Sequence, residues 1–225
     1  SDGENLMDPG DTPETNYQFQ LFLAAVLAAV DNNAEILRLS ASSAGNDHRL
    51  GANEAPPAII SAFLGEQLEG VVDQIIEKGY AEHSKPAKVY ESGVSTLPSF
   101  KMDATDRNRT SPFAFTGNRF EFRMVGSTQP ISQPTMMLNT IVANELSLIA
   151  DKLDAAEDKD ACIKTLIREM LTEHQRIIFN GNGYSEEWVE EAAKRGLPNI
   201  TCMVEAVPYL TTDKTIEVFK RMGVM

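Results

Sequence analysis

The stretch TNYQFQLFLAAVLAAVDNNAEILRLSA, residues 15–41, decides the fold. Apolar residues recur in it at helical spacing from Tyr17 to Leu39, which predicts one long α-helix. The side chain of Thr15 or Asn16 can cap the first turn of this helix. Because apolar side chains cover most of its circumference, we expect the helix to be buried.

The overall composition narrows the class of protein. The chain has 225 residues, of which 42% are hydrophobic, enough for one substantial core or two small ones. A net charge of −13 argues against a nucleic-acid groove or an anionic membrane surface. The run LFLAAVLAAV is much shorter than the roughly 20 residues of a membrane span, and no export signal is visible. Cys162 and Cys202 lack metal-like spacing and are typical of reduced thiols, so we expect a cytoplasmic protein.

The order of the segments predicts an α+β fold. We expect a few antiparallel strands packed with helices, followed by an all-helical C-terminal half. The corresponding division is a loop or disordered start over 1–15, a mixed region over 16–133 and a helical region over 134–225. The expected segments before residue 134 are a loop over 42–57, a buried strand over 57–64, a helix over 65–79 ended by Gly79, a long loop over 81–111 and a strand over 118–126. Beyond Pro134, Asn180-Gly181-Asn182-Gly183 marks a helix stop, and Ser185 begins the next helix.

The predicted strand NRFEFRMVG, residues 118–126, contains the most specific arrangement of charged residues in the chain. Successive side chains of a strand face opposite ways, so Arg119, Glu121 and Arg123 share one face. One interpretation is a half-exposed strand with a ladder of compensating charges. The other is a site, because arginine binds phosphate and carboxylate groups, and an acid between two arginines suits a divalent cation beside phosphate oxygens. The spacing alone supports both.

Other charged residues are ambiguous when each is taken singly. Arg107 and Arg109 lie in a loop and Glu54 lies in the run RLGANEAPPAII, where solvent exposure is the simplest interpretation. Arginines clustered in an acidic chain nevertheless favour an anionic ligand. His174 has charged neighbours in its predicted helix, so we expect it to be solvated.

Three segments in order resemble the active-site segments of the glutamine synthetase family. NDHRLGANEAPP resembles the family's N-x-x-(K)-R-L-x-x-x-x-E-A-P loop, NRTSPFAF its N-R-S/T phosphate loop, and NRFEFRMVG its R-x-E-x-R strand. The sequences GANEAPP and TGNRFEFRMVG are similar to those of the type III form. The later segment HQRIIFNGNGYSEEWVEEAAKRGLP is also similar to that form. The resemblance covers nearly the whole chain.

The resemblance implies a role for each matching residue. Glu54 would be the glutamate of a flap that closes over the site and helps take a proton from ammonium, and Arg109 would stabilise the transferring phosphoryl group. The expected substrate-binding residues are Asn46, Arg49 and Arg123, the nucleotide-side arginines are Arg109 and Arg119, and the metal ligand is Glu121. A second phosphate-side arginine of the type I pattern falls on Ala114, so that contact must be absent or supplied elsewhere.

The resemblance also implies a reaction and its partners. The family joins glutamate and ammonia with ATP and Mg²⁺ (or Mn²⁺), and it forms homo-oligomeric rings. The family's earlier metal-binding segments do not occur in this sequence, so we expect an internal to C-terminal fragment without synthetase activity of its own. Two alternatives remain open: a related glutamate–amine ligase, and a non-catalytic structural or assembly fragment.

Overall fold

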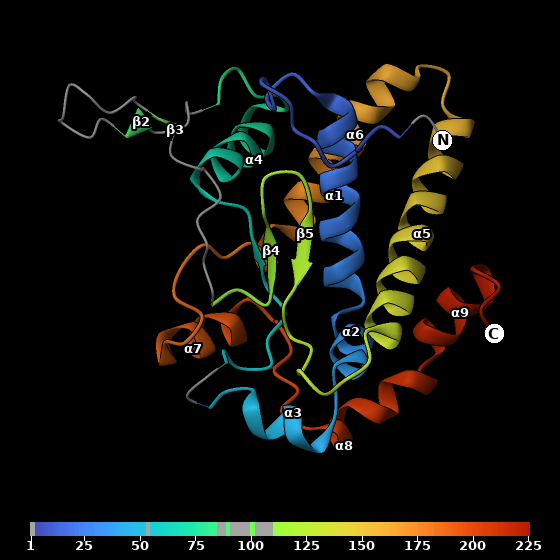
Figure 1. Ribbon diagram of the computed structural model, residues 1–225. Helices are drawn as coiled ribbons and strands as arrows, with labels where there is room; N and C mark the ends of the chain where they lie inside the picture. The colour runs from blue at the N-terminus through green and yellow to red at the C-terminus, as the bar shows by residue number, and fades with distance from the viewer. Residues whose placement is uncertain (1–2, 53–54, 85–88, 91–99, 102–109) are drawn as a thin grey trace.

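Helices make up most of the described chain, and a small mixed sheet lies among them (Figure 1). The computed structural model describes residues 3–52, 55–84, 89–90, 100–101 and 110–225. The helices are α1 (Tyr17–Asn32), α2 (Ala34–Ser40), α3 (Ala44–Arg49), α4 (Glu66–Lys78), α5 (Ser132–Ala155), α6 (Lys159–His174), η1 (Gln175–Ile177), α7 (Glu186–Lys194), α8 (Met203–Ala206), η2 (Val207–Thr211) and α9 (Asp213–Arg221). The strands are β1 (Ala62–Phe63), β2 (Val89–Tyr90), β3 (Phe100–Lys101), β4 (Phe113–Phe115) and β5 (Phe120–Phe122). This content agrees with the predicted α+β class.

Helix α1 is the centre of the hydrophobic core. It begins as predicted, because the Asn16 side chain accepts a hydrogen bond from the Phe19 backbone N–H at 3.0 Å. The helix packs against α5 and α6, and it also contacts the sheet, where the rings of Phe19 and Phe115 lie 5.8 Å apart (Figure 1). The predicted burial is confirmed, since most of its apolar side chains are inaccessible to solvent.

The predicted single helix over 17–39 is wrong, because the chain bends by 78° between α1 and α2. The backbone N–H and the side-chain Nδ2 of Asn33 both donate to the Ala29 carbonyl, at 3.2 and 3.0 Å. These bonds satisfy the end of α1 locally and stop it there. In the described residues no single helix is long and apolar enough to cross a membrane; α1 and α2 together meet that criterion by length and composition only.

The three-stranded sheet has the order β1-β4-β5. Strands β4 and β5 are antiparallel, but β1 pairs with β4 in parallel, so the expectation of purely antiparallel strands is wrong. The parallel pairing follows from the long connection between β1 and β4, which passes through α4. Ile178 adds a parallel bridge to Ala62 on the outer side of β1, and this brings the C-terminal region to the edge of the sheet.

The predicted alternation of β5 is confirmed on its apolar side. The ring of Phe120 stacks on that of Phe113 at 4.5 Å, and Phe122 meets Phe113 edge-on at 6.3 Å. Glu121 lies on the opposite face, directly across from Ala114 of β4. From Ser132 onward the described elements are helical, apart from isolated bridges at Ile178 and Asn199.

An ionic cluster around the buried Asp31 joins α1 to the end of α6. His174 Nδ1 donates to Asp31 Oδ2 at 2.8 Å, and Arg176 Nε donates to both oxygens of the same carboxylate at 2.9 and 3.0 Å. His174 is only 5% exposed, so the expectation of a solvated histidine is wrong. The neighbouring Glu173 is exposed, whereas His174 itself faces α1.

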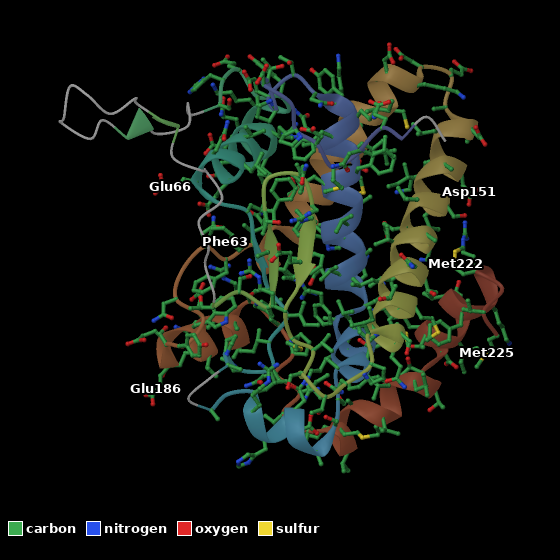
Figure 2. The ribbon with its side chains drawn as sticks, in the orientation of Figure 1. Phe63, Glu66, Asp151, Glu186, Met222 and Met225 are labelled. Carbon is green, nitrogen blue, oxygen red and sulfur yellow. The ribbon has the colours of Figure 1, made fainter. Side chains whose placement is uncertain are left out.

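The C-terminal helix packs on α5. Arg221, at the end of α9, forms an ion pair with Asp151 of α5. Figure 2 labels Asp151 and Met222 on the same side of the molecule. Helix α2 contacts α5, α8 and η2, so the bend at Asn33 also determines where the last helices lie.

Candidate functional site

The predicted loop over 42–57 begins with a short helix, α3, which carries two of the predicted substrate-binding residues. The Ser43 hydroxyl caps this helix by accepting from the Asn46 N–H at 3.2 Å. The prediction of a loop throughout was therefore wrong at its start. A local cap made by Ser43 outweighs the Gly, Asn and Asp residues that follow.

Asn46 joins α3 to the segment that follows β5. Its side chain is 3% exposed, and its Nδ2 donates to the carbonyls of Ala41, at 2.6 Å, and Met124, at 2.9 Å. Both protons of the amide are therefore used inside the protein. Asn46 holds the frame of the site and has no amide proton left for a ligand.

Arg49 lies one turn further along α3, on the same face as Asn46. Its Nε donates to Asn46 Oδ1 and its Nη2 donates to the Met124 carbonyl, both at 2.9 Å. Among the described residues, no hydrogen-bond acceptor is recorded for Nη1. Part of the guanidinium is thus fixed by the protein while part of it can bind an anion.

Arg123 follows β5 and pairs with Glu121. Its Nε and Nη2 donate to Glu121 Oε2 at 3.2 and 3.1 Å, and its backbone N–H donates to the Pro112 carbonyl at 2.7 Å. Thr116 donates to Glu121 Oε1 at 3.2 Å, whereas Nε of the mainly exposed Arg119 lies 3.9 Å from that oxygen. The hydrogen bond from Arg123 is the largest cause of a lowered Glu121 pKa, so this carboxylate is ionised at neutral pH.

Arg49 and Arg123 line one cavity of about 60 Å³. Its other lining residues are Leu50, Ala55, Pro56, Ser111, Pro112, Met124 and Tyr184. Two guanidinium groups beside an apolar wall are suited to a small carboxylate, because arginine donates in a planar fork that matches carboxylate geometry. The structure therefore brings together two of the three predicted substrate-binding side chains, with Asn46 supporting one of them.

Two predicted catalytic residues, Glu54 and Arg109, lie outside the described residues. Tyr184 was missed, although the Gly-rich turn before it was recognised as a helix stop. A turn signal marks where the chain reverses, but it does not say which distant segment the next side chain meets.

Ala114, where a type I arginine would fall, is fully buried and pairs with Phe63 of β1 and Glu121 of β5. A long cationic side chain at this central-strand position would have to displace packed neighbours. This explains in local terms why the position holds alanine.

The fit of a divalent cation depends on Glu121. Among the described residues, no group of three or more His, Cys, Asp or Glu side chains lies together. Mg²⁺ is commonly held by one or two carboxylates together with phosphate oxygens and water. Glu121 fits as one such ligand, since its pKa is lowered and its side chain is partly exposed.

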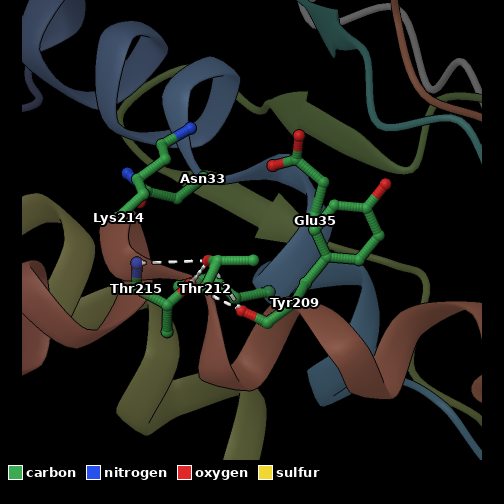
Figure 3. Close-up of a pocket in the computed structure, with 7 residues that line it drawn as sticks. Asn33, Glu35, Tyr209, Thr212, Lys214 and Thr215 are labelled. Carbon is green, nitrogen blue, oxygen red and sulfur yellow. Dashed lines mark hydrogen bonds between the residues drawn. The ribbon is translucent and has the colours of Figure 1, made fainter.

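A second cavity, of about 150 Å³, lies between α2 and the start of α9 (Figure 3). It is lined by Asn33, Glu35, Ile36, Tyr209, Thr212, Lys214 and Thr215. Thr212 Oγ1 donates to the Tyr209 carbonyl at 3.1 Å and accepts from the Thr215 N–H at 3.4 Å. These polar groups cap α9, and none of the predicted site residues lines this cavity.

Comparison with known proteins shows a likeness to glutamine synthetases. Residues 162–225 match the model of the glutamine synthetase C-terminal domain. The chain is 44% identical over 226 residues to a type-3 glutamine synthetase of Dictyostelium discoideum, covering 99% of this chain and 31% of that protein. It is 46% identical over 228 residues to a glutamine synthetase of Butyrivibrio fibrisolvens, covering 99% of this chain and 32% of the relative. A glutamine synthetase of Bacteroides fragilis (strain YCH46) is 43% identical over 219 residues, which cover 95% of this chain and 30% of the relative. The chain thus spans about a third of the length of these curated relatives, and it is similar to these glutamine synthetases over nearly all of its own length.

Proposed function

We propose that this chain is part of an ATP- and Mg²⁺-dependent glutamate–ammonia ligase, and that it contributes the part of the active site that binds the glutamate carboxylate. The observation that carries the proposal is the shared cavity of Arg49 and Arg123. These residues come from different segments, which are joined where Arg49 donates to the carbonyl of Met124, the residue after Arg123 and 75 positions from Arg49.

The chemistry of glutamine formation requires such a site. The γ-phosphoryl group of ATP is transferred to the side-chain carboxylate of glutamate, and ammonia then displaces phosphate. Two anions must approach each other, so fixed positive charge lowers the barrier. In this proposal Arg49 and Arg123 bind the substrate, and Arg109 and Arg119 have the role of neutralising the phosphate groups. Glu121 would supply one ligand to Mg²⁺, which would neutralise part of the negative charge on the phosphate groups.

The phosphoryl transfer gives an acyl phosphate on the glutamate side chain, and this intermediate must be protected from water until ammonia reacts with it. Glu54 lies in the segment between Arg49 and the buried stretch that leads into β1, which suits a flap that covers the cavity from one side. Its carboxylate would attract ammonium and accept a proton from it. Ala55 and Pro56, which follow Glu54 directly, line the arginine cavity.

The whole enzyme is proposed to be a cytoplasmic homo-oligomeric ring, and this chain alone is proposed to be inactive. Among the described residues, Glu121 is the carboxylate that we assign to the metal, and no group of three or more metal-ligating side chains lies together. The chain alone would therefore hold Mg²⁺ poorly, and the negative charge of ATP would not be neutralised. The test of inactivity is γ-glutamyl hydroxamate formation by the purified 225-residue chain with ATP, Mg²⁺, glutamate and hydroxylamine. We expect none above a reaction without protein, and measurable product would contradict this part of the proposal.

Substrate binding is tested separately, by isothermal titration of the chain with L-glutamate. We expect Arg123→Ala to weaken binding at least about tenfold, equivalent to about 1.4 kcal/mol. Arg221→Ala is the matched control, because that arginine pairs with Asp151 on α5, and it should leave the affinity unchanged. Equal affinities for the Arg123→Ala variant and the unmodified chain would refute the assignment, and so would absence of binding by the latter.

A further inference from the structure

The segment 180–184 connects the edge of the sheet to α7, and its first residue is fixed to the two residues that follow β1. The backbone N–H of Phe179 donates to the Ala62 carbonyl at 2.9 Å. Asn180 Oδ1 then accepts from the backbone N–H groups of Leu64 and Gly65, each at 3.0 Å. The start of the segment therefore cannot shift without breaking backbone contacts of the strand.

Gly183 holds the middle of the segment against Thr110, the residue directly after Arg109. Its N–H donates to Thr110 Oγ1 at 2.9 Å. A Cβ atom at this position would lie 2.5 Å from the Thr110 carbonyl oxygen, closer than real Cβ contacts allow. The absence of a side chain at Gly183 is therefore what permits the two segments to lie this close.

The far end of the segment is fixed by α7. The Ser185 hydroxyl accepts from the Trp188 N–H at 3.2 Å, which caps the helix as predicted. The ring of Trp188 stacks on that of Phe179 at a centroid distance of 3.7 Å, and the guanidinium of Arg195 lies 5.6 Å from the Trp188 ring. Tyr184 thus stands between two anchored points, the Gly183–Thr110 contact and the start of α7.

Tyr184 contributes to the wall of the cavity that contains Arg49 and Arg123. Five of the other lining residues have no polar side-chain group, and the hydroxyl of Ser111 is occupied by donation to the Phe113 carbonyl at 3.0 Å. Tyr184 therefore adds an aromatic surface and a phenol group to a cavity whose charge comes from two arginines. Tyr184 also lies within residues 162–225, the matched C-terminal domain, whereas both arginines lie before it.

From these contacts we propose that Tyr184 is a substrate-contacting residue of the glutamate site. The C-terminal domain thereby supplies one wall of the cavity in addition to its packing role. This inference rests on the proposed function, because it takes the arginine cavity to be the glutamate site.

The test is titration of the 225-residue chain with L-glutamate, compared with the variants Tyr184→Ala and Tyr184→Phe. We expect Tyr184→Ala to weaken binding about tenfold, equivalent to about 1.4 kcal/mol. If Tyr184→Phe loses the same amount, the contact is made by the hydroxyl, and if it binds normally, the contact is made by the ring; both results support the proposal. The control is Tyr80→Ala, because Tyr80 is similarly exposed, at 49% against about 43% for Tyr184, and does not line the cavity.

The proposal is overturned if the unmodified chain binds L-glutamate and Tyr184→Ala binds equally well. Weaker binding by Tyr80→Ala to the same extent would also overturn it, since the effect would then be general. If the unmodified chain does not bind L-glutamate at all, the proposed function fails first. The circular dichroism spectrum of each variant must match that of the unmodified chain. If Tyr184→Ala does not fold, Tyr184→Leu, which keeps an apolar side chain but removes both the ring and the hydroxyl, takes its place, and normal binding of L-glutamate by that variant overturns the proposal.

Discussion

Replacing Asn46 by alanine should destabilise the protein and release Arg49 from its fixed position. The substitution removes two hydrogen bonds to backbone carbonyls, of Ala41 at 2.6 Å and of Met124 at 2.9 Å. It also removes the Oδ1 atom that accepts from Arg49 Nε at 2.9 Å. Because Asn46 is 3% exposed, water cannot easily replace it.

The magnitude follows from these three contacts. A net contribution of about 1 kcal/mol for each hydrogen bond sums to about 3 kcal/mol, with a lower limit of about 2 kcal/mol if the Met124 carbonyl keeps its bond from Arg49. Asn46→Asp should cost more than Asn46→Ala, because a carboxylate oxygen would face two carbonyl oxygens.

Urea unfolding followed by the fluorescence of Trp188 measures this loss. Trp188 is the single tryptophan of the chain and is 3% exposed, so its emission changes when the core opens. Asn118→Ala, in the exposed turn between β4 and β5, is the matched control and should change the free energy of unfolding by less than about 0.5 kcal/mol. An Asn46→Ala loss as small as that of the control would refute the view that Asn46 holds the frame of the site.

Three further substitutions test other parts of the structure. Asp31→Ala should lower the free energy of unfolding by about 3–5 kcal/mol, because the buried His174 and Arg176 would both lose the carboxylate that they bond to. A loss below about 1 kcal/mol would show that the cluster does not stabilise the fold. Gly70→Ala should raise stability by about 0.5–1 kcal/mol, since a Cβ there meets nothing within 4 Å and alanine favours the helix α4; thermal unfolding that shifts downward would contradict this. The folded pKa of Glu121 is lowered by its arginine partner, so the stability that it adds is present above the ordinary glutamate pKa and is lost as pH falls through the lowered value. Glu121→Gln should therefore reduce the acid dependence of unfolding in that range, and an unchanged pH profile would count against the ion pair.

Local features could be predicted from the sequence because their causes lie within a few residues. Asn16 and Ser185 cap helices through contacts with the following turn, and Gly79 ends α4 at a φ of +87°. The alternation of β5 was likewise readable from the pattern of Phe120 and Phe122. The polar face of the same strand was ambiguous, because spacing does not show what lies opposite.

Features that depend on distant segments could not be predicted. The parallel pairing of β1 with β4 and the burial of His174 against Asp31 both depend on how the helices pack. The hydrogen bond from Asn46 to the Met124 carbonyl joins residues 78 positions apart, so no local sequence pattern predicts it. The family resemblance predicted Arg49 and Arg123 as substrate-binding residues, whereas the position of Tyr184 beside them emerged only from the structure.

The central claim is that Arg49 and Arg123 bind one carboxylate together. The most direct measurement follows the Nε–H resonances of both arginines by NMR during titration of the 225-residue chain with L-glutamate, with potassium chloride at equal ionic strength as the reference. We expect both resonances to shift and to give the same dissociation constant. The claim would be contradicted if only one of them moved, if the two gave different constants, or if potassium chloride produced the same shifts.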